Sequence, residues 1–272
     1  MVASDQLLPI SSPRGFSAPT HLLYVDDVLI FCRGTVRNLR RVVHAFRVYD
    51  SISGQLVNWS KSSIFFGFSV SPARISSLQS LVGMQIGRLS FYYLGVPLFR
   101  GKPRKSVLMP IADKILSKFD KWKGKSLSLA GKATLIRSAI TGSFVHPFMV
   151  YKWPISLIQM VTKKIKNFLW ISSCEENWNS CCRPYAFGGL GLKDLALLND
   201  SLLRRLTWKF ITSNNIAFTF LSERYIRQLQ KPHGGYITSS IWNSFSTNYV
   251  ELITNGIWLI GENSQRDFWR DN

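Results

Sequence analysis

Acidic side chains are scarce in this sequence. Only 15 of its 272 residues are Asp or Glu, against 34 Lys or Arg, so the formal net charge is +19. The four cysteines are too few for a disulfide framework in a chain of this length, which indicates a reduced, intracellular setting in the nucleus or cytoplasm. No uncharged apolar run reaches about 18 residues, and residues 1–14 lack a signal-peptide pattern, so no membrane partner is expected.

The positive charge is concentrated in one quarter of the chain. Residues 100–170 hold 15 Lys or Arg against only Asp113 and Asp120, whereas residues 171–272 are nearly neutral. A basic helical segment between less charged segments is typical of a surface that contacts phosphates, and nucleic acid is the commonest polyanionic partner. The alternative is a solvated helical face that binds nothing.

The order of apolar and polar residues predicts an α+β fold. Hydrophobic residues make up 46% of the chain and charged residues 18%, as in globular proteins. Residues 1–20, which are rich in proline and serine, read as an irregular lead-in. Apolar spacing predicts helices over 37–52, 72–82, 107–122, 128–140, 155–170 and 195–211, with Ser128 as an N-cap and Gly54 as a C-cap. Strands are expected within 21–32, 62–68 and 89–98.

An acidic turn is the most informative local feature. Asp26 and Asp27 follow Tyr24 and Val25 between two apolar runs, which predicts two short strands joined by a tight turn. Carboxylate oxygens are hard ligands suited to Mg²⁺, and a metal pair held by carboxylates is one way to catalyse phosphoryl transfer. The competing interpretation is an ordinary hairpin, because aspartate is also a good turn residue.

The motifs around this turn, taken in order, resemble a known family. The run HLLYVDDVLIFC over 21–32 is similar to the catalytic motif of reverse transcriptases. The segment SGQLVNWSKS over 53–62 resembles the one that follows it in non-LTR (LINE-type) retrotransposons, and YLGVPL over 93–98 looks like the primer-grip turn. The segment KWKGKSLSLAGK over 121–132 resembles the thumb helices, and GGLGLKD over 188–194 and FWRD over 268–271 resemble the region that follows the thumb. The plant-genome type of element is the nearest resemblance.

This resemblance implies a division of the chain into segments. Residues 1–20 would be the lead-in, 21–103 a partial polymerase palm, 104–170 a basic helical thumb and 171–272 a connecting region. The family's zinc-binding segment would come after this region. Cys174, Cys181 and Cys182 do not have the Cys-x-x-Cys spacing that is typical of zinc ligands, so no zinc site is expected among them.

The resemblance also assigns roles to individual residues. Asp26 and Asp27 would be catalytic metal ligands for Mg²⁺, Tyr24 would lie beside the primer terminus or template, and Lys61 is a candidate general acid or else an ordinary surface lysine. Leu94 and Gly95 would hold the primer strand. The thumb would follow the backbone of an RNA template paired with a DNA primer, or of an RNA–DNA hybrid, through Lys114, Lys118, Lys121, Lys123 and Lys125. No small-molecule cofactor is indicated.

Two roles can be predicted for four aromatic residues near the ends of the thumb helices. Phe119, Trp122, Phe168 and Trp170 could stack on bases, but on an apolar helix stripe they are more often core residues, and the core reading is favoured.

One part of the polymerase site is missing. In the family a further palm carboxylate lies well upstream of the acidic turn, whereas here only Asp5 precedes it, beyond three intervening prolines. We therefore expect a truncated RNA-directed DNA polymerase (a nucleotidyltransferase) that is inactive alone. Two alternatives stay open, namely a non-catalytic nucleic-acid-binding module built on the thumb and an unstable pseudogene product.

Overall fold

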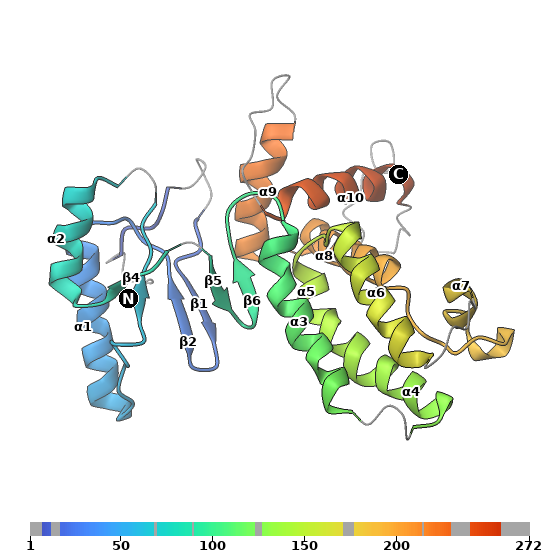
Figure 1. The fold of residues 1–272 in the computed structure, drawn as a ribbon. Helices are drawn as coiled ribbons and strands as arrows, with labels where there is room; N and C mark the ends of the chain where they lie inside the picture. Colours follow the sequence, from blue (N-terminus) through green and yellow to red (C-terminus); the bar gives the residue numbers. More distant parts are fainter. Residues whose placement is uncertain are drawn as a thin grey trace. The chain divides into compact units, whose positions relative to one another are not determined.

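The computed structural model describes residues 7–11, 17–67, 70–88, 90–122, 127–170, 177–213, 215–229 and 240–256. Among these residues helices predominate and the strands form three two-stranded sheets, so the predicted α+β class is confirmed (Figure 1). The chain divides into two compact units, Met1–Phe91 with Ser213–Tyr236, and Tyr92–Thr212 with Ile237–Asn272. Among the described helices, none is long and apolar enough to span a lipid bilayer.

The first unit begins with the predicted hairpin and helix. Strands β1 (His21–Tyr24) and β2 (Asp27–Ile30) pair in antiparallel register, with Tyr24 opposite Asp27. Helix α1 (Val36–Ser53) starts at Thr35, whose side chain accepts a hydrogen bond from the Asn38 amide, and it ends at Gly54 with φ of 69°. The predicted glycine C-cap is therefore confirmed, because this left-handed conformation favours glycine.

Asn38 fixes the start of α1 to the chain that precedes it. Its side chain is fully buried, accepts a hydrogen bond from the Leu8 amide at 3.1 Å, and donates to the carbonyls of Leu8 and Arg33, each at 2.9 Å. One side-chain amide thus satisfies three backbone groups from two residues, Leu8 and Arg33, which is how a buried polar side chain avoids a desolvation penalty.

The remaining elements of the first unit are short. Helix α2 (Pro72–Val82) packs against α1 and has the predicted bounds. The strand expected over 62–68 is wrong in extent, because only β3 (Ser63–Ile64) pairs, in parallel, with β4 (Gln85–Ile86). The partner strand offers only two residues, and strand formation depends on such a partner more than on local sequence. Helix α9 (Ile216–Leu229) belongs to this unit by its contacts.

The second unit is a bundle of helices with a small hairpin. Strands β5 (Phe91–Tyr93) and β6 (Val96–Leu98) pair across a two-residue turn. Helix α3 (Lys105–Lys121) packs against α6 (Ile155–Leu169), and their apolar stripes meet in the largest core of the described chain. The apolar spacing that predicted these two helices lies on their buried faces, since the side chains of Leu108, Ile111, Ile115, Ile158, Val161 and Ile165 are buried.

The helix predicted over 128–140 is longer and less regular than expected. Ser128 caps α4 (Leu129–Leu135) by accepting from the Gly131 amide, as predicted. The chain then continues as a π-helix (Ile136–Thr141) and as α5 (Gly142–Val150). Four large buried side chains follow at intervals of four residues, namely Ile136, Ile140, Phe144 and Phe148. An α-helix with about 3.6 residues per turn would rotate such a stripe away from the core, so the wider π turn keeps it facing inward.

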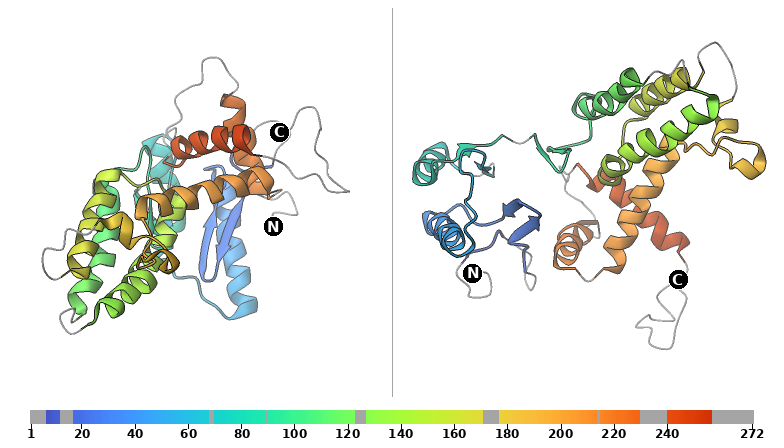
Figure 2. Two further views of the ribbon diagram at one scale, coloured as in Figure 1. Left: turned by 90° about the vertical axis from the view of Figure 1, so that its right-hand side faces the viewer. Right: turned by 90° about the horizontal axis from the view of Figure 1, so that it is seen from below.

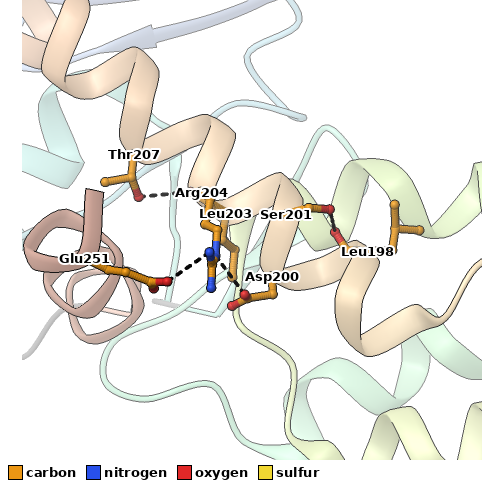
Figure 3. A network of polar contacts seen from close by, with 7 residues as sticks. All are labelled: Leu198, Asp200, Ser201, Leu203, Arg204, Thr207 and Glu251. Atoms are coloured by element: carbon orange, nitrogen blue, oxygen red, sulfur yellow. Dashed lines mark hydrogen bonds and ion pairs between the residues drawn. The ribbon is translucent and has the colours of Figure 1, made fainter. Parts of the chain in front are cut away.

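Two helices close the second unit. Helix α8 (Leu195–Thr212) packs on α5 and on α10 (Trp242–Asn255), and the Phe210 and Phe245 rings lie 4.3 Å apart between them. At the surface of this pair, Arg204 joins Asp200 and Glu251 at 2.9 and 3.0 Å, as Figure 3 shows. Because all three side chains are partly exposed, this network adds little stability beyond the aromatic contacts.

Asn199 links α8 to the junction of α5 and α6. Its buried side chain donates to the carbonyls of Phe148 and Tyr151, both at 2.8 Å, and accepts from the Trp153 amide at 2.9 Å. These backbone groups lie where α5 ends, so they lack partners within the helix itself. The further views in Figure 2 show α8 lying against α5 and α10.

Candidate nucleic-acid interface and acidic hairpin

The acidic turn is a strained and exposed hairpin tip. Val25 has a backbone φ of 50° and is 87% exposed. A β-branched residue in this left-handed region is an outlier that costs of order 1–3 kcal/mol, and such strain gathers at functional sites. Asp26 and Asp27 are both exposed, and neither carboxylate has a hydrogen bond or ion pair with any residue that the structure describes.

The metal-binding capacity of this hairpin is limited. Two adjacent carboxylates suit a hard divalent cation, and Mg²⁺ commonly binds through one or two carboxylates together with substrate phosphates. Over the described ranges, however, no group of three His, Cys, Asp or Glu side chains comes together. Asp5 lies outside those ranges. The described residues therefore fit one weakly held cation but do not complete a two-metal site.

Lys61 lies in a turn after α1. The side chain of Asn58 accepts hydrogen bonds from the Lys61 amide at 3.1 Å and from the Ser60 hydroxyl at 2.7 Å, so this turn is well defined. The Trp59 ring meets Phe46 of α1 edge-on at 6.0 Å, which holds the segment on the helix. The Lys61 side chain itself is exposed and makes no ion pair with Asp26 or Asp27. Its role as a general acid therefore stays a prediction.

The second hairpin presents the predicted primer-binding residues at its tip. Leu94 and Gly95 have φ of 50° and 79°, the backbone of a two-residue turn whose twist matches the flanking strands. Strand β6 is held firmly, because Val96 is buried and the Tyr151 hydroxyl donates to the Pro97 carbonyl at 2.7 Å. The tip is therefore an exposed turn on a rigid base.

The lysines of α3 differ in their availability. Lys114 and Lys121 are exposed and lie two turns apart on the helix. Lys118 is half-buried and donates to the Ser143 hydroxyl at 2.6 Å, so part of its role is to join α3 to α5. Lys123 and Lys125 lie outside the described residues. Helix α6 adds two exposed lysines that the predicted set omitted, Lys163 and Lys164.

The lysines of α3 and α6 make no ion pair with any residue that the structure describes. In this unit Arg204 of α8 pairs with Asp200 and Glu251 instead. Asp113 and Asp120, the two acids of this segment, are exposed and also make no ion pair there. A surface with this charge attracts polyanions without reading their sequence.

Lys132 and the four aromatic residues have contacts inside this unit. Lys132 is buried and donates to the Leu169 carbonyl at 3.4 Å, which places a positive charge at the C-terminal end of α6. The core reading of the four aromatic residues is confirmed, since all four are partly buried against the core. Phe119 and Phe168 have ring centroids 4.5 Å apart, and the Trp122 ring lies within 6 Å of both.

The structure describes two cysteines of the connecting region, Cys181 and Cys182. Burial, together with the nearby charge of Asp194, raises the pKa of Cys182 to about 11. Cys181 is buried, and Cys174 lies outside the described residues.

A cavity of about 390 Å³ lies beside this region. Its lining combines two amines with one carboxylate, and comprises Ile155, Ile158, Gln159, Thr162, Lys163, Lys166, Trp178, Asp194 and Ala196.

Comparison with known proteins gives two relatives. A candidate ribonuclease H protein of Arabidopsis thaliana is 24% identical over 190 residues, which make up 65% of this chain and 30% of that protein. The 149 kDa protein of transposon TX1 of Xenopus laevis is 27% identical over 178 residues, or 62% of this chain and 13% of that protein. No protein-family profile matches the sequence. The chain is thus related to a transposon protein, and it spans less than a third of the length of either relative.

Proposed function

We propose that this chain is a fragment of the reverse transcriptase of a non-LTR retrotransposon, and that its helical unit holds a primer–template hybrid. The observation that carries the proposal is the acidic hairpin followed, in family order, by the Lys61 segment, the Leu94–Gly95 turn and the lysine-rich helices. The similarity to a transposon protein supports the same origin.

Electrostatics support the binding part of the proposal. The exposed amines of Lys114, Lys121, Lys163 and Lys164 have no acidic partner among the described residues, so they repel one another in the free protein. A phosphate backbone relieves this repulsion and releases counterions, which makes binding favourable at low salt. Neither step requires contact with base edges, so affinity should not depend on sequence.

We further propose that the chain does not polymerise by itself. The described carboxylates of Asp26 and Asp27 lack a third partner, and in-line phosphoryl transfer with two metals needs more ligands than this pair supplies. The test is extension of a DNA primer on an RNA template with Mg²⁺ or Mn²⁺ present. No incorporation above that of Asp26→Ala protein is expected, and incorporation that this substitution abolishes would overturn the proposed inactivity.

The binding part is tested separately with a blunt RNA–DNA hybrid over a range of salt concentrations. The logarithm of the association constant should fall linearly with the logarithm of salt concentration. Joint Lys114→Ala and Lys121→Ala substitution should reduce that slope by about 0.9 for each phosphate that the variant no longer neutralises. The matched control removes two exposed charges from α8, Arg205→Ala with Lys209→Ala, and should leave the slope nearly unchanged.

Two outcomes would contradict the binding proposal. One is the absence of hybrid binding at low salt by a chain that unfolds cooperatively on heating, which shows that the helical unit is folded but does not bind. The other is an equal effect of the α3 and α8 substitutions, because that would mean net charge alone determines the affinity. A gradual, non-cooperative melt would instead favour an unstable product and would count against the whole proposal.

A further inference from the structure

The glycine-rich loop after α7 (Trp178–Cys181) has a compact backbone of its own. The Gly191 amide donates to the Arg183 carbonyl at 2.9 Å, and the Leu190 and Leu192 amides both donate to the Cys181 carbonyl, at 3.1 and 3.3 Å. A Cβ atom on Gly189 would lie 2.0 Å from the Arg183 carbonyl oxygen, so only glycine permits this closure. The loop therefore presents its side chains from a fixed position.

This loop turns its aliphatic residues inward and its aromatic residues outward. Leu192 is buried in the core and Leu190 packs against it. The short 3₁₀ turn (η3, Tyr185–Phe187) exposes its two rings instead, with Tyr185 62% and Phe187 74% exposed. Neither ring is buried in the core of this unit, so most of the surface of both rings is available to a partner.

The charges around these rings are positive. Arg137, from the π-helix, donates a hydrogen bond to the Tyr185 hydroxyl, and its guanidinium carbon lies 5.2 Å from the centre of that ring. Arg183 and Lys193 are exposed on the same loop. The adjacent acid, Asp194, accepts hydrogen bonds from the Ala196 and Leu197 amides at 2.8 and 2.9 Å, so it caps α8.

We infer that Tyr185 and Phe187 are a stacking platform for unpaired bases of a single-stranded nucleic acid, with Arg137, Arg183 and Lys193 near its phosphates. Exposed aromatic rings set among basic side chains are the usual chemistry of single-strand binding, because every base has a face that can stack. The cations favour a polyanion over an apolar protein segment, which would gain nothing from them. This inference rests on the proposed function. It adds that the connecting region binds the single-stranded part of the nucleic acid.

The test compares two kinds of ligand, paired and unpaired, and three variants of the full chain. A blunt RNA–DNA hybrid is measured beside unpaired RNA and DNA oligonucleotides of mixed sequence. Joint Tyr185→Ala and Phe187→Ala substitution should weaken single-strand binding about tenfold or more and leave binding of the blunt hybrid within about twofold, given the usual worth of one stacked base. Leu197→Ala removes a side chain that is 72% exposed and apolar but lies outside the platform, so it should change neither. Tyr185→Phe keeps the ring and loses only the hydroxyl, so it should retain most of the single-strand affinity.

The outcomes separate this inference from the proposed function. Unchanged single-strand binding by the double variant, with normal hybrid binding, overturns the platform alone. Platform-dependent single-strand binding without any hybrid binding overturns the hybrid-holding role alone. If the double variant instead loses self-association in light scattering and keeps its single-strand affinity, the rings are a protein contact and the inference is wrong.

Discussion

Replacing Asn199 with alanine should destabilise the helical unit strongly. The substitution removes three buried hydrogen bonds of 2.8–2.9 Å and leaves the carbonyls of Phe148 and Tyr151 and the Trp153 amide without that partner. A typical hydrogen bond contributes about 1 kcal/mol, and each buried group left unsatisfied costs about 1–3 kcal/mol. Because the cavity left by alanine has room for water at some of these groups, a total near 3 kcal/mol is expected.

Hydrogen exchange is the suitable assay, because a chain with two compact units need not unfold in a single transition. The slowest amides of α5 and α6 should exchange about 100-fold faster in Asn199→Ala, the rate change that corresponds to about 3 kcal/mol of opening free energy. Amides of α1 should keep their rates, because α1 belongs to the other unit.

Thr207→Val in the same helix is the matched control. The Thr207 side chain is equally buried, but its hydroxyl donates at 2.9 Å to the Leu203 carbonyl, within its own helix. Its loss should therefore cost no more than about 1 kcal/mol. Asn199→Asp should be at least as destabilising as alanine, since it sets a buried carboxylate against two carbonyl oxygens. Equal exchange rates in Asn199→Ala and Thr207→Val would refute the assigned role of Asn199.

Two further predictions concern the loop and its thiol. Gly189→Ala should open the loop and expose α7 to proteolysis, because the new Cβ atom would lie 2.0 Å from the Arg183 carbonyl oxygen. In contrast, the Cβ atom of Gly142→Ala would meet nothing within 4 Å, so this substitution should stabilise α5 by up to about 1 kcal/mol in thermal melts. Cys182 should be alkylated slowly at neutral pH and faster as pH rises to about 11, and an alkylation rate that levels off near pH 8 would contradict this. Because the pKa of Cys182 is higher in the folded than in the unfolded protein, its contribution to stability is complete below the unfolded pKa and is lost as pH rises toward 11.

Local signals in the sequence predicted local structure well. Pro72 and Gly83 bracket α2, and Ser128 and Gly54 act as the predicted caps, because each works through its immediate neighbours. The acidic hairpin was also predictable, since apolar runs on both sides of a two-residue turn leave few other arrangements. The strand over 62–68 failed because its length depends on a partner some twenty residues away, which local pattern does not reveal.

The residues that organise each unit could not be read from the sequence. Asn38 and Asn199 look like ordinary polar positions on helices, yet each holds backbone groups up to 30 and 51 residues away, respectively. Lys118 reads as a surface lysine, and only its hydrogen bond to Ser143 shows a structural role. In contrast, the four-residue spacing of Ile136, Ile140, Phe144 and Phe148 was visible and signals the wider helical turn.

That wider turn has a consequence for the length of the chain. An α-helix that buries one stripe alternates steps of three and four residues, so the stripe through 136, 140, 144 and 148 contains one residue more than a regular helix needs. Removing a single residue between Ile140 and Phe144 would restore steps of four, three and four and keep both ends of the stripe in the core. The same deletion in the middle of α6 would rotate half of its buried face by about 100° into solvent. Gaps of one residue among related sequences should therefore gather within the stretch from α4 to α5 and avoid α6.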